Sequence, residues 1–282
     1  MSIIRTYQSK FFGGHLNLET YNSAQEVADD LEKRERTDSR FHDAFEGNRT
    51  FVGATKEQAL EMLRYGYQPV VNSLKTKMRI SASGQAKRFK SFNDVCGYQP
   101  IIPNAIMGLP NSMINLSMKP IKTKVVDIYY EMTVPAMREA KELIEAGQKM
   151  LGVILELEAQ GYRFNLYCVQ GYYDEGKGCD MLCVKVKSAN QPMDLKRMSF
   201  PIAHTAFFRG IGFEWYSKFP KGTYRSGYGY AISVKKSVES IQAEYKKLFG
   251  NNAIYFSANT LCSKKDKAEE YLKGVLTNDS NK

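Results

Sequence analysis

Apolar positions recur along this chain at two different spacings, and the first part of the sequence follows the spacing of helices. Over residues 20–90 apolar side chains return every three or four positions, as on one face of an amphipathic helix. The run 23–26 (Ser-Ala-Gln-Glu) has the form of a capping box and predicts a helix that reaches to about residue 36. The run 55–58 (Thr-Lys-Glu-Gln) predicts a second helix, and Gly66 is placed to end it.

Prolines then interrupt the helical pattern. Residues 92–121 form an apolar segment that holds Pro100, Pro103, Pro110 and Pro120. A proline lacks the N–H group that a helix needs and clashes with the preceding turn, so long helices are excluded here. We expect extended segments and turns that pack on the core of the protein.

From residue 122 short strand-like runs alternate with helical patterns. A long helix is predicted over residues 135–160, and strands of one sheet are predicted over residues 125–132, 164–169, 181–187 and 254–257. The glycine-rich turn 171–178 suits an antiparallel hairpin. The sequence therefore predicts an α/β fold, a three-layer sandwich with a mixed central sheet. A mainly helical N-terminal region with a proline-rich connector (1–121) is expected to precede the α/β core (122–282).

Charged residues are distributed unevenly. The chain has a formal net charge of +10. Residues 62–126 hold ten basic residues and one acidic residue, a net charge of +9. Residues 185–225 hold eight basic and two acidic residues, a net charge of +6. Such segregation favours an anionic partner more than solubility alone requires.

Aromatic side chains are interleaved with the basic ones in both blocks, which favours nucleic acid as the anionic partner. Cations neutralise phosphates, and an aromatic ring beside them can stack on an unpaired base. Single-stranded DNA or RNA, or another negatively charged assembly, is the expected partner, and no signature of a known RNA-binding or DNA-binding module chooses among them. The candidate binding residues are Lys75, Lys77, Arg79, Lys87, Arg88, Phe89, Lys90, Arg209, Lys221, Tyr224, Arg225 and Tyr228.

The leading interpretation is a non-enzymatic binding protein. Two other functions stay open. A protein-interaction factor, such as a host-takeover or virion-associated component, would dock through the apolar, proline-rich segment 98–118. An enzyme would need a site assembled from scattered residues around His204 and Asp127, because no nucleotide-binding or nucleophile motif occurs. No cofactor is expected.

The cysteines and the hydropathy of the chain indicate its redox state and its location in the cell. The five cysteines are an odd number in apolar surroundings, which predicts reduced thiols. Cys179 and Cys183 fall on one face of a predicted strand, and we interpret them as small core residues rather than half of a zinc site. Without a long apolar run or a signal pattern, the chain is expected to be cytoplasmic, in the host cell if viral, with no membrane partner. The sequence leaves the oligomeric state open.

The order strand–helix–hairpin between Val125 and Val186 resembles the core of von Willebrand factor A-like domains. That family binds a divalent ion through an Asp-x-Ser-x-Ser motif after its first strand. The corresponding run here, residues 127–133 (Asp-Ile-Tyr-Tyr-Glu-Met-Thr), lacks the paired serines. The resemblance therefore implies the topology and not the metal site.

Three other pieces of the sequence resemble an uncharacterised family of bacteriophage-encoded proteins. This resemblance implies a viral origin and a phage accessory role, with no particular activity. The pieces are residues 51–55 (Phe-Val-Gly-Ala-Thr) before the predicted helix 59–66, Gly97 with residues 108–110 (Gly-Leu-Pro) and Met113, and residues 201–204 (Pro-Ile-Ala-His) with Arg209.

Overall fold

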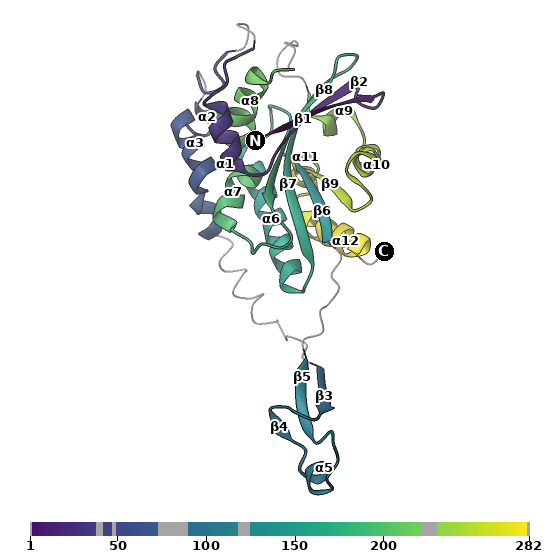
Figure 1. Cartoon of the computed structure of the whole chain (residues 1–282). Coiled ribbons are helices and arrows are strands. Elements are labelled where there is room, and N and C mark those ends of the chain that lie inside the picture. Colours follow the sequence, from purple (N-terminus) through teal and green to yellow (C-terminus); the bar gives the residue numbers. More distant parts are fainter. Residues whose placement is uncertain are drawn as a thin grey trace.

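A six-stranded mixed sheet forms the centre of the protein in the computed structural model (Figure 1). The structure describes residues 2–37, 42–46, 49–72, 90–117, 125–221 and 230–280. The strands lie in the order β1-β2-β8-β7-β6-β9. Their bounds are β1 Ile3–Ser9, β2 Gly14–Tyr21, β6 Val125–Glu131, β7 Arg163–Asp174, β8 Gly178–Lys187 and β9 Ala253–Ser257.

Both strand directions occur in this sheet. β6 runs parallel to β7 and to β9, and β2 runs parallel to β8. The pairs β1–β2 and β7–β8 are antiparallel hairpins. The turn between β7 and β8 covers Glu175 to Lys177, so the predicted glycine-rich hairpin is confirmed with longer strands than expected.

Alternation along the strands gives the sheet two apolar faces. On β6, Val126, Ile128 and Tyr130 point to a first face and join a large core, while Tyr129 points to a second face and joins a smaller core. Cys179 and Cys183 are buried on the second face, so their predicted role as core residues is confirmed.

Helices cover both faces, which confirms the predicted three-layer α/β architecture. The second face is covered by α9 (Ile232–Lys235) and α10 (Val238–Phe249), whose apolar side chains lie in the smaller core. The first face is covered by α1 (Ala24–Leu31), α3 (Lys56–Tyr65), α6 (Ala140–Ala159), α7 (Leu195–Ala203), the π-helix η1 (Phe207–Gly212), α8 (Phe213–Lys218), α11 (Ala258–Lys264) and α12 (Ala268–Ser280). No helix within the described residues is long and apolar enough to cross a membrane.

The central helix α6 explains how the first face is packed. Leu143, Met150 and Leu157 recur at helical spacing and are all buried against the sheet. Gly147 lies against the backbone of α7, where any side chain would overlap the carbonyl of Ile202. The helix begins at residue 140 rather than at residue 135, because residues 135–139 form a turn held by other contacts.

The four strands predicted after residue 122 are confirmed in one sheet, whereas β1 and β2 were not predicted. In the run 15–19 (His-Leu-Asn-Leu-Glu) polar and apolar residues do alternate, but Asn17 and Glu19 are buried as well, on the side of the large core. Asn17 donates a hydrogen bond to Asp180 over 2.8 Å, and Glu19 binds Arg34 and the indole of Trp215. Buried polar pairs of this kind do not show in a hydropathy pattern, which therefore indicates a strand with one solvated face and not a strand buried on both faces. The N-terminal residues therefore share one sheet with the residues after 122.

A small second sheet follows residue 90 and is drawn as a separate unit in Figure 1. Its strands are β3 (Lys90–Asp94), β4 (Gln99–Pro100) and β5 (Met113–Ser117), in the order β3-β5-β4, with the short helix α5 (Ile102–Ile106) between β4 and β5. Extended segments and turns were expected here and are confirmed. Their packing on a core is not, because none of residues 91–115 is buried.

Candidate anion-binding site

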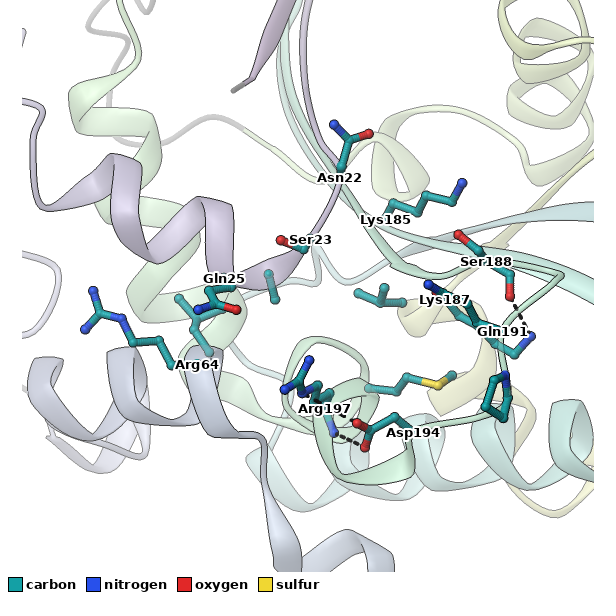
Figure 2. Close-up of a pocket in the computed structure, with 15 residues that line it drawn as sticks. Asn22, Ser23, Gln25, Arg64, Lys185, Lys187, Ser188, Gln191, Asp194 and Arg197 are labelled. Atoms are coloured by element: carbon teal, nitrogen blue, oxygen red, sulfur yellow. Dashed lines mark hydrogen bonds and ion pairs between the residues drawn. The ribbon is translucent and has the colours of Figure 1, made fainter.

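A pocket of about 430 Å³ lies at one edge of the six-stranded sheet and is lined by four basic side chains. These are Arg64, Lys185, Lys187 and Arg197, with Asp194 as the acidic residue. Amides and hydroxyls fill the spaces between them, from Asn22, Ser23, Gln25, Ser188 and Gln191 (Figure 2). We call this set of residues the basic pocket.

Parallel pairing of β2 with β8 creates this edge. Both strands end on the same side of the sheet, so the residues after Tyr21 and after Lys187 meet there. The helices α1 and α7 begin at the same edge. Ser23 caps α1 by accepting a hydrogen bond from the amide of Glu26, and Asp194 caps α7 in the same way. Two strand ends and two helix starts thus converge on one pocket.

A bulge near the end of β8 separates the two lysines of the pocket. The strand pairing skips one residue, because Leu166 faces Lys187 while its neighbour Tyr167 faces Lys185. Val186 is the extra residue, which turns Lys187 toward the first face. Lys185 stays on the second face, with its ammonium 5.7 Å from the centre of the Tyr167 ring. The bulge therefore directs one lysine inward and leaves the other outside.

Lys187 has a structural role. Its side chain is almost inaccessible to water, and its ammonium lies 2.6 Å from the carboxylate of Glu158. It also donates to the carbonyls of Phe164 and Ser188. A buried ammonium with three acceptors would lose all of them by turning to a ligand, so Lys187 shapes the pocket without reaching into it.

The other cations of the pocket are accessible to a ligand. Lys185 makes no ion pair with any residue that the structure describes. Arg197 pairs with Asp194 over 3.5 Å, but both side chains are more than half exposed. Arg64 binds Glu32 and Asp29 at the surface, and the hydrogen bond that its guanidinium donates to Glu32 is the main cause of a raised pKa of Arg64. Exposed ion pairs are worth about 0–1 kcal/mol, which a phosphate contact can replace.

Contact between α3 and α7 brings the two basic blocks of the sequence together at this pocket. The amide of Tyr67 donates to the carbonyl of Lys196 over 2.8 Å. Gly66, in a left-handed conformation with φ of 84°, lies so close that a side chain would overlap the backbone of Lys196. Gly66 ends α3 as predicted. The close contact sets Arg64, from the first block, opposite Arg197, from the second.

The candidate residues named from the sequence are placed differently. Lys90 is the first residue of β3, in the small sheet. Lys221 is exposed beside β1, where its ammonium donates to Thr6 over 2.6 Å. The remaining candidates except Arg209 lie outside the described residues, namely Lys75, Lys77, Arg79, Lys87, Arg88, Phe89, Tyr224, Arg225 and Tyr228.

The prediction for Arg209 is wrong, because its side chain is buried and is not part of a binding surface. Its guanidinium stacks on the Phe51 ring at 4.1 Å and donates to the carbonyls of Phe51, Ala136 and Arg138. Burial lowers the pKa of Arg209. The side chain holds the turn after β6 against the residues around Phe51. The sequence pattern missed this role because a single arginine in an apolar run does not reveal its acceptors.

His204 and Asp127 do not form a joint site. His204 is buried on the first face between the rings of Tyr67 and Phe200, and its Nδ1 accepts a hydrogen bond from the amide of Ala206. Asp127 is on the second face and accepts a hydrogen bond from Asn165. The sheet separates the two side chains, so the arrangement considered for an enzyme is not present.

A second cavity, of about 570 Å³, opens where β6 and β9 end. The helix after β6 covers the first face and the helix before β9 covers the second, and such switch points often bind ligands. Here the guanidinium of Arg138 is already engaged by Asn259, Glu142 and Ser263. One cation and one carboxylate balance each other, so this cavity offers less to an anion than the basic pocket does.

The described residues contain no cluster of side chains that could form a metal centre. No group of three or more His, Cys, Asp or Glu side chains there is arranged to hold a metal ion. All five cysteines are free, and only Cys96 is exposed. The pocket chemistry is therefore that of cations and amides, which bind oxyanions.

Comparison with known proteins places the chain in one family. No curated protein and no solved structure matches it. A family model described as a domain of unknown function, DUF7192, matches residues 6–279. The match includes the six-stranded sheet from within β1 onward, the small sheet and nearly all of α12. The chain therefore belongs to the DUF7192 family of domains of unknown function.

Proposed function

We propose that this protein binds the phosphate backbone of a single nucleic-acid strand, with the basic pocket as one contact point. The observation that supports the proposal is the meeting of the two basic blocks, because Arg64 comes from residues 62–126 and the other three cations come from residues 185–225. Cations far apart in the sequence are brought into one pocket.

Pocket chemistry supports a phosphate ligand. Lys185 and Arg197 are two of the three accessible cations of the pocket, beside Arg64, and amide side chains such as Asn22 and Gln191 supply hydrogen-bond donors. Phosphate oxygens accept strong hydrogen bonds from charged donors. A pocket of about 430 Å³ holds one or two phosphate groups rather than a whole strand, so the rest of the strand would follow the surrounding basic residues.

Fluorescence anisotropy with a labelled single strand tests the proposal. Affinity should fall steeply from about 50 to 200 mM salt, because each phosphate contact releases counterions. The variant Lys185→Gln/Arg197→Gln should bind more weakly and with a shallower salt slope. The expected decrease of the slope is about 0.7 per lost contact.

A matched control keeps the net charge equal. Lys141→Gln/Lys247→Gln removes two exposed lysines, on α6 and α10, that do not line the pocket. It should retain a slope close to that of the unmodified protein. Equal losses in both double variants would overturn the pocket as the contact point. No affinity for DNA or RNA at about 50 mM salt would overturn the function itself.

A further inference from the structure

The small sheet and α5 carry an apolar surface that the rest of the described chain leaves in water. Ile106 is 80% exposed, Val95 is 70% exposed, and Ile102 and Met107 are each 65% exposed. Tyr98, Leu109 and Phe92 are exposed as well. We call these seven residues the apolar patch. Ile102 and Ile106 are four residues apart on α5 and therefore lie on the same side of the helix.

This unit lacks a core of its own. None of residues 91–115 is buried, and α5 buries no residue at all. Three strands need a hydrophobic face packed on something to be stable in water. The backbone contacts are nevertheless well formed, because Tyr98 and Ile101 donate to carbonyls of Ile114 and Ser112. The small sheet therefore needs another apolar surface to pack against.

Patch area matches what a protein interface requires. Two aromatic and five aliphatic side chains, about two-fifths to four-fifths exposed, together leave on the order of several hundred Å² of apolar surface on this unit. A standard interface buries about 800 Å² on each partner, and a monomer rarely exposes an apolar patch of this size.

Charge indicates which partner fits. The small sheet, residues 90–117, has two charged residues of opposite sign, Lys90 and Asp94, and the Asp94 carboxylate already accepts hydrogen bonds from Asn115 and the amide of Val95. A different protein selected by this basic chain would be expected to meet complementary charges, and the patch supplies none. In a two-fold dimer the same patch of both copies meets at the interface. Like charges would then face each other, so a neutral apolar patch suits such a contact and a patch of one charge does not.

Strand order leaves one edge of the small sheet open to the same kind of contact. β3 pairs with β5 and has no second neighbour among the described strands. The opposite edge, β4, is two residues long and contains Pro100, which lacks an N–H group. We propose that the apolar patch is a dimerisation surface that packs against the same patch of a second copy of this chain.

Sedimentation equilibrium of the full chain tests the dimer. The mass should rise from 32.1 kDa toward twice that value with concentration. Residues outside 91–117 carry a net charge of +11, which is +10 without the −1 of Asp94, so two copies repel each other through their basic surfaces. Dimerisation should therefore strengthen as salt rises, the opposite of nucleic-acid binding. The two proposals can thus fail independently.

Uncharged variants identify the surface. Ile106→Ser/Met107→Ser should stay at the monomer mass, because both side chains are exposed and their loss leaves no cavity. Met137→Ser/Val234→Ser, two exposed apolar residues outside the unit, should dimerise like the unmodified protein. A monomer mass for the unmodified protein at all concentrations overturns the proposal, and so does a dimer that survives the first pair of changes.

Cys96 gives an independent measurement. It is exposed within the unit while the other four cysteines are buried, so a nitroxide label attaches there selectively. Electron–electron dipolar spectroscopy should show a defined distance between the labels of two copies. The distance should disappear in Ile106→Ser/Met107→Ser. Absence of any distance in a protein that is dimeric by mass would place the interface elsewhere and overturn the proposal.

Discussion

Lys187 and Glu158 form an ion pair of 2.6 Å beneath the basic pocket, where the Lys187 side chain is 1% exposed and the Glu158 side chain 12% exposed. The pair joins the end of β8 to α6, and the same ammonium holds the carbonyls of Phe164 and Ser188. The wall that carries Ser188 and Gln191 into the pocket therefore depends on one buried charge.

Replacing Lys187 with methionine should destabilise the protein while leaving most of the packing intact. Methionine keeps the apolar stem but leaves Glu158 and two carbonyls without their donor. Loss of one partner of a buried ion pair costs about 3–5 kcal/mol, and the partial exposure of Glu158 favours the lower end. Urea unfolding of Lys187→Met measures the change.

Two further variants separate the buried charge from the pocket. Lys187→Met/Glu158→Met removes both charges and should recover part of the lost stability. Lys185→Met, at the accessible lysine, should change the free energy of unfolding by less than about 0.5 kcal/mol. An unfolding midpoint of Lys187→Met equal to that of the unmodified protein would show that the pair contributes nothing.

Gly212 should not tolerate a side chain. A Cβ at this position would overlap the amide of Gln170 and meet the hydroxyl of Tyr172, whose own hydrogen bond joins the same network. Gln170 also donates to the carbonyl of Phe207, so moving it breaks a buried contact. We expect Gly212→Ala to cost about 1–3 kcal/mol by thermal or urea unfolding.

Gly274 provides the matched control for this change. It lies in α12, and a Cβ there would meet nothing within 4 Å. Gly274→Ala should raise the free energy of unfolding by about 0.5–1 kcal/mol, because alanine restricts the unfolded chain more than glycine does. Effects of the same sign in both variants would show that the overlap at Gly212 is relieved by movement of Gln170.

The glycines illustrate what the sequence revealed about the fold. The glycine-rich turn 171–178 predicted an antiparallel hairpin, and the pairing of β7 with β8 confirms it. Local signals of this kind, including the cap at Thr55 and the end of α3 at Gly66, depend only on nearby residues. They were therefore readable without tertiary information.

The basic pocket was not predictable in the same way. Lys185 and Arg197 belong to a block whose charge was noted, but the pattern pointed to Arg209, which is buried. The pairing of β2 with β8 ends at Tyr21 and Val184 and so brings Asn22 beside Lys185, more than 160 residues away in sequence. The alternation of polar and apolar residues along β2 does not specify which strand lies beside it, so this pairing could not be read from the sequence.

Stability should fall as pH decreases through the range set by His204. Burial lowers the pKa of His204 from 6.5 to about 4, so the folded protein holds this side chain neutral. Below pH 6.5 His204 becomes protonated in the unfolded chain but stays neutral in the folded chain, which favours unfolding. Between pH 6.5 and 4 the loss should approach about 3 kcal/mol, and above pH 6.5 the contribution disappears.

His204→Asn isolates this contribution. The Asn carbonyl can still accept the hydrogen bond from the amide of Ala206, but the side chain does not titrate. Urea midpoints at several pH values should fall more steeply for the unmodified protein than for the variant between pH 6.5 and 4.5. The smaller Asn side chain lowers the stability of the variant by the same amount at every pH, so it does not affect the slope of the urea midpoint against pH. Parallel slopes would mean that His204 is protonated without loss of structure.

The basic run 87–90 (Lys-Arg-Phe-Lys) should contribute to nucleic-acid binding separately from the pocket. Three of its cations meet phosphates in the proposed complex, so Lys87→Gln/Arg88→Gln/Lys90→Gln should reduce the salt slope on a single strand by about 2. Phe89→Ala should cost about 1–3 kcal/mol of affinity at every salt concentration, because stacking on a base releases no counterions.

Combining the variants shows whether one strand contacts both places. The pocket double variant and the triple variant of residues 87–90 remove different cations, so their effects on the salt slope should add when both sites hold the same strand. Each variant must retain the thermal unfolding midpoint of the unmodified protein, since these side chains are proposed to bind ligand rather than to support the fold. A triple variant with an unchanged slope would exclude the run 87–90 from the interface. A lower midpoint for Phe89→Ala with unchanged affinity would instead assign Phe89 to packing.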